Sequence, residues 1–353
     1  MHTIHDVAKA AGVSITTVSR ALNGHSDVGE KTRQRIISIA KELDYQPNAA
    51  ARNLRTKRTD SIALAPGLPP AEEANLFFKQ FIGTLAFDCF QHNLSLLVTL
   101  PYLQADATKT YQQLARTSRV DGIILASIQP QDQRIALLQS MDMPFVAFGR
   151  LRAENDLTYP FVDVDGKMAI RKIVDYLYGQ GHRRIAYLSD LLDASYIYYR
   201  RDGYLEALQA HNLSEDPRLI IMGLHSQQET TQALESLFGL SAESIPTAIV
   251  TSNDRLAMYV LSALRMQGRA VGKGAGQIAL ASFDDLPFAA YIQPSLTTIH
   301  PPLEELSKLL LELLVSILKQ EELNIQEAIY PHATRLGPQQ FLLEPDLIIR
   351  DSA

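Results

Sequence analysis

Hydrophobic positions change their spacing near residue 60, and this change divides the chain into two parts. Before it, apolar side chains recur every three or four residues; after it, short continuous apolar runs alternate with longer amphipathic stretches. The first pattern predicts helices, and the second predicts parallel strands that helices cover on both faces. We therefore expect a small helical head followed by an α/β body.

Two short helices are expected around a tight turn, over residues 4–11 and 15–22. Thr3 and Ser14 can cap the two helices, and Gly12 can adopt the left-handed conformation of the turn at almost no cost. Apolar residues form the side on which the helices pack: Ile4, Val7, Ala8, Ala11, Val13, Val18, Ala21 and Leu22.

The other side of the second helix is expected to be exposed. It presents Ile15, Thr16, Ser19 and Arg20. A short exposed helix of this kind fits the major groove of DNA, where an arginine can bind the O6 and N7 atoms of guanine. A helical hairpin with an ordinary solvated face would give the same local pattern, but the features that follow favour DNA.

A third helix and a basic segment follow. One helical stripe of apolar positions predicts the helix from residue 30 to about residue 44. Pro47 stops it, and Asn48 can cap the alanine-rich, basic segment at residues 49–55. Helices this short are marginal in water, so we expect the segment to fold only against a partner.

Charge is divided unevenly between head and body. Residues 1–60 hold ten Lys and Arg against six Asp and Glu, a net charge of +4; the remaining residues hold 23 against 33, a net charge of −10. A basic head on an acidic body indicates contact with DNA phosphates at one end only. A solvated charged face explains either value alone but explains the asymmetry less well.

Composition limits the class of protein. The chain has 353 residues, 46% of them hydrophobic, which is ample for a large core. No apolar run is long enough to cross a membrane, and the first residues form a capped helix, not a signal peptide. The single cysteine, Cys89, suits a reducing cytosol, so we expect a cytoplasmic protein with a buried, inert thiol.

The body is predicted to be built from alternating strands and helices. Strands are expected at residues 61–65, 94–99, 122–127, 145–148, 184–189, 248–251 and 278–282. Helices are expected at residues 77–91, 167–179, 203–210, 256–266 and 303–318, the last as a core and subunit-interface helix. Ligands of such folds bind at the carboxyl ends of the strands.

Two doubly wound lobes are expected, with the chain crossing between them near residues 159–165, 293–300 and 323–326. The predicted divisions are a helix-turn-helix domain (1–46), a hinge helix and linker (47–60), and a core (61–353) in which lobe 1 takes about 61–161 and 296–323 and lobe 2 about 162–295 and 324–353.

The chain resembles the lactose-repressor/galactose-repressor family of bacterial transcription regulators along its whole length. The matching residues are Ile4-His5-Asp6-Val7-Ala8, Ala11-Gly12-Val13-Ser14, Thr17-Val18-Ser19-Arg20, Thr32-Arg33, Leu43, Tyr45, Pro47-Asn48, Ala51-Arg52 and Leu54-Arg55. The resemblance implies a homodimer on a near-palindromic operator in double-stranded DNA. It also implies a body like the periplasmic sugar-binding proteins, with a small effector between the lobes.

The resemblance also implies roles for single residues of the head. Ile15, Thr16 and Arg20 occupy the base-reading positions. The residues that position the DNA backbone would be Thr3, Ser14, Thr17, Ser19, Asn23, Tyr45 and Asn48. The minor-groove contacts of the hinge would be Ala51, Leu54 and Arg55, with Leu54 inserted between base pairs.

The family's effector positions fall on polar and aromatic residues of the body. Arg200 would grip adjacent hydroxyls, Asp284 would accept from them, and Asn253 could both donate and accept. The further contacts would be Phe77, Phe78, Arg150 and Tyr196, with one phenylalanine in the pocket and the other buried. Asp254 and Asp285 are interpreted as helix caps or dipole partners.

This inventory favours a sugar, such as an α-galactoside or α-glucoside, that releases the protein from DNA. A non-sugar corepressor stays an alternative, as does a cytosolic sugar-binding protein or sugar enzyme with an accessory head. Catalysis is not expected, because the sequence has no Gly-rich phosphate loop, metal-ligand cluster or spaced nucleophile–base pair. We therefore expect neither a cofactor nor a metal.

Overall fold

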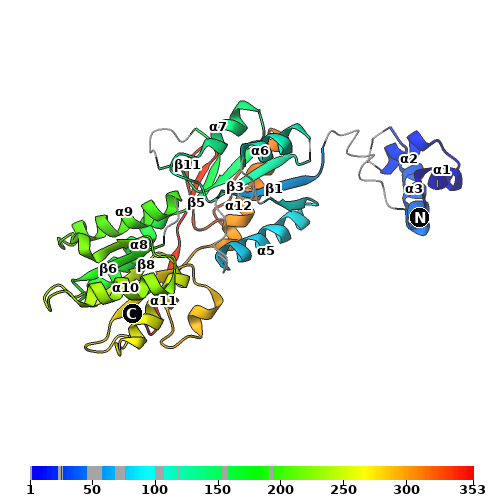
Figure 1. Cartoon of the computed structure of the whole chain (residues 1–353). Coiled ribbons are helices and arrows are strands. Elements are labelled where there is room, and N and C mark those ends of the chain that lie inside the picture. Colours follow the sequence, from blue (N-terminus) through cyan, green and yellow to red (C-terminus); the bar gives the residue numbers. More distant parts are fainter. Residues whose placement is uncertain are drawn as a thin grey trace. The chain divides into compact units, whose positions relative to one another are not determined.

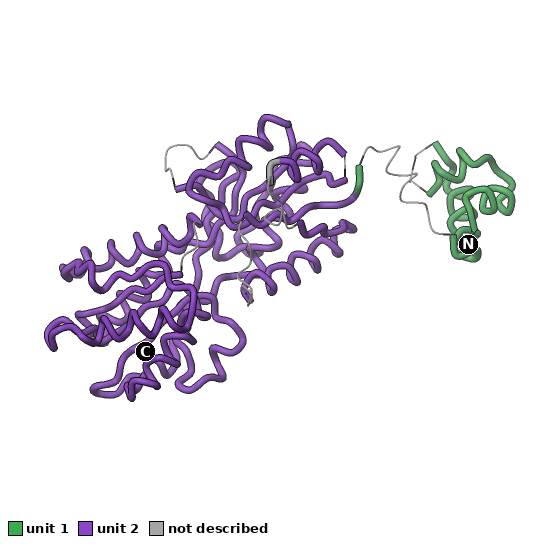
Figure 2. Tube along the Cα trace, in the orientation of Figure 1, with its two compact units in different colours: residues 1–59 green, residues 60–353 purple. Residues whose placement is uncertain are grey.

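The computed structural model describes residues 2–22, 25, 27–45, 58–67, 76–99, 107–117, 119–152, 158–190 and 194–353. The chain divides into two compact units, residues 1–59 and 60–353 (Figure 2). The first unit, the head, contains α1 (Ile4–Ala11), α2 (Ile15–Leu22) and α3 (Glu30–Glu42) (Figure 1). The first two helices have the predicted bounds, and the third ends two residues early.

The predicted apolar positions hold the head together. Val7, Val18 and Ile36 are fully buried at its centre, one from each helix. Gly12 has a φ of +63° and closes the turn after α1. The Ser14 hydroxyl accepts a hydrogen bond from the Thr17 backbone N–H at 3.1 Å, which is the expected cap of α2.

Lobe 1 of the body is a seven-stranded sheet in the order β11-β12-β5-β4-β3-β1-β2. Its strands are β1 (Ser61–Pro66), β2 (Ser95–Val98), β3 (Gly122–Ala126), β4 (Phe145–Phe148), β5 (Phe161–Val164), β11 (Ala333–Gly337) and β12 (Gln340–Leu343). Only β11 runs antiparallel to its neighbour. Its helices are α5 (Leu76–Gln91), α6 (Ala107–Arg116), α7 (Gln133–Ser140) and α12 (Leu303–Lys319).

Lobe 2 is a six-stranded sheet in the order β13-β10-β9-β8-β6-β7. Its strands are β6 (Ile185–Ser189), β7 (Ile220–Met222), β8 (Ala248–Thr251), β9 (Ala279–Phe283), β10 (Thr297–His300) and β13 (Asp346–Ile348), of which β13 is antiparallel to β10. Its helices are α8 (Gly166–Gly179), α9 (Ser195–Ala210), α10 (Gln227–Phe238) and α11 (Asp254–Met266).

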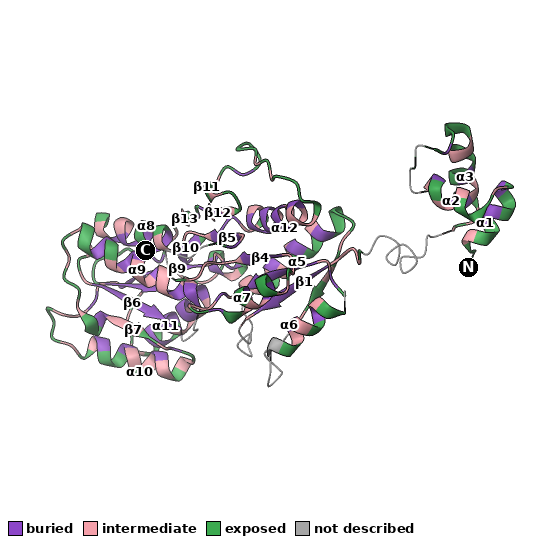
Figure 3. Ribbon diagram, turned by 90° about the horizontal axis from the view of Figure 1, so that it is seen from above, coloured by how far each residue is buried: buried purple, intermediate pink, exposed green. Residues whose placement is uncertain are grey.

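Successive side chains of a strand point to opposite faces of the sheet, and helices cover both faces. Both sets of side chains are therefore apolar, and the inner strands appear in the sequence as unbroken apolar runs. Ile62 and Leu64 of β1 belong to the core under α5 and α12, whereas Ala63 and Ala65 belong to the core under α6 and α7. In lobe 2, α8 and α9 cover one face of the sheet, and α10 and α11 cover the other. The inner strands of both sheets, such as β3 and β6, are buried along their whole length (Figure 3). The predicted fold class is confirmed.

The assignment of segments to the lobes needs correction. β5 stays in lobe 1, beside β4, and β10 lies in lobe 2, beside β9, although residues 296–300 were expected in lobe 1. The hairpin of β11 and β12 pairs with β5, so residues 333–343 belong to lobe 1. The last crossing therefore falls between Leu343 and Asp346, not near residues 323–326. These strands are short or partly polar, so the apolar pattern does not reveal which sheet edge they join.

Two positions of the body are tightly enclosed by their neighbours. Gly203 of α9 packs so closely on α8 that a Cβ atom there would lie 2.2 Å from the backbone oxygen of Lys167. Cys89 is fully buried, and burial raises the pKa of its thiol to about 12, as an inert thiol requires. Within the described ranges, no helix is both long and apolar enough to span a membrane.

Candidate functional site

A cavity of about 270 Å³ lies where strand ends from both sheets meet. Lobe 1 contributes Phe148 and Asp163 from β4 and β5, and lobe 2 contributes residues that follow β6, β8 and β9. Carboxyl ends of parallel strands are the usual ligand position in such folds. The cavity therefore lies where the strand pattern predicted a ligand.

Arg200 reaches the cavity from α9. Its guanidinium carbon lies 3.5 Å from the ring centre of Phe283 and 4.7 Å from that of Tyr196, so two aromatic rings hold it. One terminal nitrogen donates to the Ser252 carbonyl. The Nε atom is buried and has no hydrogen-bond partner among the described residues. A held guanidinium with an unused donor can bind a ligand oxygen.

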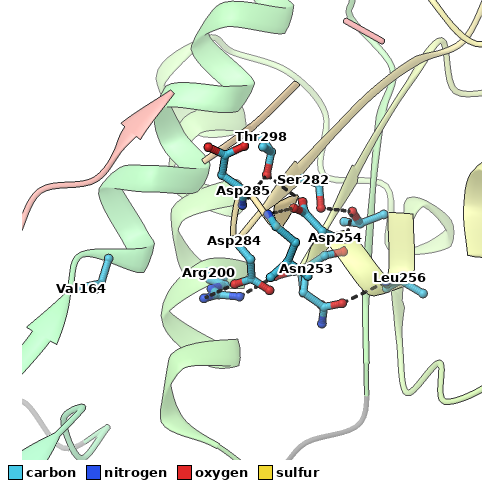
Figure 4. A network of polar contacts seen from close by, with 12 residues as sticks. Val164, Arg200, Asn253, Asp254, Leu256, Ser282, Asp284, Asp285 and Thr298 are labelled. Atoms are coloured by element: carbon cyan, nitrogen blue, oxygen red, sulfur yellow. Dashed lines mark hydrogen bonds and ion pairs between the residues drawn. The ribbon is translucent and has the colours of Figure 1, made fainter. Parts of the chain in front are cut away.

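Asp284 follows β9 and faces Arg200, as Figure 4 shows. The Arg200 Nη2 and Asp284 Oδ1 atoms are 3.9 Å apart. Burial raises the pKa of the Asp284 carboxyl well above its ordinary value, and the nearby Arg200 acts in the opposite direction. Its backbone has a φ of +121°, a strained conformation for a residue with a side chain. Such strain collects at ligand sites, where the rest of the fold holds it in place.

Asn253 caps α11, and this fixes its amide. Its Oδ1 accepts from the Leu256 N–H at 2.9 Å (Figure 4), and its Nδ2 donates to Asp190 at 2.7 Å. The acceptor expected to serve a ligand is therefore already used by the helix. The same Nδ2 also donates a long hydrogen bond to Ser252 Oγ at 3.4 Å, which is the weakest of the three and the one that a ligand could most easily replace.

Asp190 was missed by the sequence analysis. It follows β6 directly, is 3% exposed, and accepts from Ser252 Oγ at 2.9 Å and from Arg255 Nη2 at 3.3 Å, as well as from Asn253. Both Asp190 and Arg255 line the cavity. Its position in the sequence, directly after a predicted buried strand, could have identified it as a candidate site residue.

Aromatic rings form much of the lobe 1 side. Phe77 and Phe78, at the start of α5, both line the cavity, so the expectation of one lining and one buried ring is wrong. The ring centres of Phe77 and Phe148 are 6.2 Å apart. Tyr196 also lines the cavity, as expected.

Arg150 has a different role from the expected one. Its Nε donates to Asp163 at 2.9 Å, and its guanidinium carbon lies 4.2 Å from the ring centre of Tyr199. Asp163 and Tyr199 line the cavity, so Arg150 lies behind them. Arg255, not Arg150, is the second guanidinium that lines the cavity.

Asp254 is another buried acid. It is the first residue of α11 and therefore lies at the positive end of the helix dipole, as expected, whereas Asn253 is the residue that caps the helix. Its carboxylate accepts from the Leu286 N–H at 2.8 Å and from the Thr298 hydroxyl at 2.7 Å (Figure 4). The side chain is fully buried, and burial raises its pKa to about 7. Asp285 likewise caps no helix: it pairs with Arg350 at 2.7 Å and with His300 at 2.9 Å.

Replacing Asp254 with asparagine is expected to flatten part of the pH dependence of stability. The folded chain keeps this carboxyl protonated up to about pH 7, whereas in the unfolded chain it ionises near its ordinary value of 3.8. Folding takes up a proton between these values, so its contribution to the free energy of unfolding falls as pH rises, by up to about 1.4 kcal/mol per pH unit. Urea unfolding at pH 5, 6 and 7 should show a smaller fall for Asp254→Asn. The exposed Asp142→Asn should keep the wild-type slope.

The residues of α2 that were predicted to read DNA are exposed in the head. Ile15, Thr16 and Arg20 lie on its free side, and Arg20 pairs with Asp27 at 2.7 Å. Tyr45 packs partly against the head core. Four further expected contacts lie within the described part of the head: Thr3, Ser14, Thr17 and Ser19. The others lie outside the described residues: Asn23, Asn48, Ala51, Leu54 and Arg55.

A helix-turn-helix head joined to a two-lobed body with a ligand cavity defines a ligand-responsive transcription regulator. Two family models match: "Bacterial regulatory proteins, lacI family" at residues 3–48 and "Periplasmic binding protein-like domain" at residues 174–352. The chain belongs to the LacI family of bacterial regulators, as its sequence resemblance predicted.

Three similar proteins place the chain within this family. The transcriptional regulator RafR of Escherichia coli is 33% identical over 81% of this chain and 83% of its own length. The transcriptional repressor PurR of Vibrio vulnificus is 28% identical over 100% of this chain and 98% of its own. The structure of the transcriptional regulator CelR in complex with cellobiose is also similar. The match covers 100% of this chain and 100% of the CelR chain, at 25% identity and a TM-score of 0.69.

Proposed function

We propose that this regulator represses genes of carbohydrate use and leaves its operator when a sugar binds in the cavity. The observation that carries the proposal is the cavity's two-sided lining. Arg200, Asn253 and Asp284 supply hydrogen-bonding groups from lobe 2, and phenylalanine rings face them from lobe 1. Flat aromatic faces suit the C–H faces of a sugar ring while polar groups bind its rim. The CelR complex with cellobiose supports this ligand class.

An α-galactoside or α-glucoside is the proposed kind of sugar. A non-sugar corepressor is the second candidate, because the PurR relatives are named as repressors and cover the whole chain. The two candidates have opposite effects on the affinity for the operator: the proposed sugar weakens operator binding, whereas a corepressor strengthens it. DNA titrations with and without a ligand that stabilises the protein separate them.

The proposed switch links the cavity to the hinge. A ligand that contacts both lobes changes their relative orientation, and the two hinge segments of a dimer then move relative to each other. Because a helix as short as residues 49–55 is marginal, a coupling of about 1–3 kcal/mol would melt or form it. In this proposal Leu54, supported by Ala51 and Arg55, keeps the protein on DNA in the cytoplasm.

A homodimer is the proposed assembly, because two heads are needed to read two half-sites. The proposed contact is an apolar surface on lobe 1. Phe87 and Phe90 of α5 are 62% and 75% exposed, and Leu97 and Val98 of the edge strand β2 are also exposed. Large exposed rings beside an uncovered sheet edge suit a second copy of this chain.

Replacing Arg20 with glutamine is expected to reduce specific DNA binding by roughly ten- to a hundredfold, because a bidentate arginine–guanine contact contributes about 1–3 kcal/mol. Fluorescence anisotropy at fixed salt on a palindromic DNA selected from a random pool measures the loss. Binding to unrelated DNA should change little. Arg35→Gln, on the exposed face of α3, is the matched control. Equal losses for both variants would contradict the proposed reading by α2.

A further inference from the structure

We infer that Asp190 makes the cavity selective for an uncharged ligand, and that anionic sugars are rejected. The inference rests on the proposed sugar effector and adds the charge of the ligand. It comes from three ion pairs, each of which joins one guanidinium to one carboxylate at the cavity.

Each cation at the cavity has its own acid. Arg255 pairs with Asp190 at 3.3 Å, and Arg200 lies 3.9 Å from Asp284. Behind the lining, Arg150 pairs with Asp163 at 2.9 Å. At Arg255, the cation that Asp190 pairs with, no excess positive charge is therefore left for an anion.

Burial and hydrogen bonds fix the position of the Asp190 carboxylate. It is 3% exposed and accepts hydrogen bonds from Ser252, Asn253 and Arg255. An anionic ligand that took the Arg255 guanidinium would leave this buried carboxylate without its cation and beside a second negative charge. A buried charge without its partner is strongly destabilising, so the anion would bind poorly.

A hydroxyl group of a neutral sugar can satisfy all of the unused hydrogen-bonding groups at the cavity. The Ser195 hydroxyl is 1% exposed and the Arg200 Nε is buried; both belong to residues that line the cavity, and both lack a hydrogen-bond partner among the described residues. They can donate to a ligand oxygen. Asp284 has Arg200 only at 3.9 Å and needs donors. A hydroxyl group donates and accepts, whereas an ionised carboxylate or phosphate only accepts.

Binding of matched neutral and anionic sugars tests the inference. The probes are melibiose, galactose with galacturonate, and glucose with glucose 6-phosphate, measured by thermal shift and calorimetry on the full chain. In the wild type we expect the neutral member to bind at least thirtyfold more tightly. Asp190→Asn removes one carboxylate and leaves Arg255 unpaired, so the preference should fall at least tenfold.

Two further variants complete the design. Asp216→Asn removes a surface acid of the same lobe, which pairs with Arg218 at 2.6 Å, and should leave the preference unchanged. If Asp190→Asn does not fold, Arg255→Gln removes the cation of the same pair. The carboxylate of Asp190 is then unpaired, and the preference for the neutral sugar should widen; an unchanged preference overturns the role of Asp190.

The outcomes are distinct. An anionic sugar that binds the wild type as well as its neutral counterpart overturns the charge selection and leaves a sugar effector standing. An unchanged preference in a folded Asp190→Asn protein overturns the role of Asp190. A failure of every probe to bind overturns the sugar effector itself, and the inference with it.

Discussion

Effector binding is expected to fall by at least a hundredfold when Arg200 is replaced with methionine. The guanidinium is held between Phe283 and Tyr196 and is the nearest cation to the buried Asp284. Methionine keeps the apolar stem but removes every donor and leaves Asp284 without its cation. Truncating one member of a buried charge pair costs about 2–5 kcal/mol, and each 1.4 kcal/mol is tenfold in affinity.

Calorimetry with the sugar that gives the largest thermal shift on the wild type measures this loss. Arg201→Met is the control, because Arg201 is the next residue of α9 and pairs with Asp202 away from the cavity lining. Its affinity should stay within about twofold of the wild type. If Arg200→Met binds normally while remaining folded, the ligand site lies elsewhere in the protein.

The free energy of unfolding of the body is expected to fall by about 2–3 kcal/mol in Gly203→Ala. The new Cβ would lie 2.2 Å from the Lys167 carbonyl oxygen, which is backbone at the start of α8 and cannot rotate away. The two helices must separate, and overpacking of this kind costs roughly 1–3 kcal/mol, occasionally more. Because Arg200 lies one turn earlier on α9, ligand affinity should fall as well.

Urea unfolding followed by circular dichroism tests this prediction. Gly179→Ala, at the end of α8, is the control, since no heavy atom lies within 4 Å of its added Cβ. That variant should gain up to about 1 kcal/mol, because alanine has the higher helix propensity. Equal stability of the two variants would show that α8 and α9 have room to separate without loss.

The sequence predicted those helices and strands whose own residues show a clear hydrophobic pattern. Seven unbroken apolar runs became strands within about two residues, and the polar side of α2 is exposed as expected. Polar residues interrupt the pattern in β5 and β10, where Asp163 and Thr298 occupy buried strand positions. Their membership in a sheet depends on distant segments, which no local period can reveal.

The site was predictable only in part, for the same reason. Arg200, Asn253 and Asp284 came from the family resemblance and do line the cavity. Nothing in the local pattern could show that Asn253 uses its amide oxygen to cap α11, or that Arg150 is paired with Asp163. Those assignments need the partner across space. Asp190 lies at a strand end, and its significance depends on Arg255, 65 residues further along the chain.

The crossings between the lobes also determine when each part of the protein can fold during synthesis. The leucines of α12 complete the core beneath β1, β3, β4 and β5, yet α12 begins at Leu303, long after β5 ends at Val164. At about 5–20 residues per second, the ribosome takes roughly ten to thirty seconds to add that stretch. Through this interval one face of lobe 1 has α5 but lacks α12, and the part that α12 will cover is open to chaperones. The three described helices of the head lie within the first 42 residues, so they can pack together as soon as they emerge.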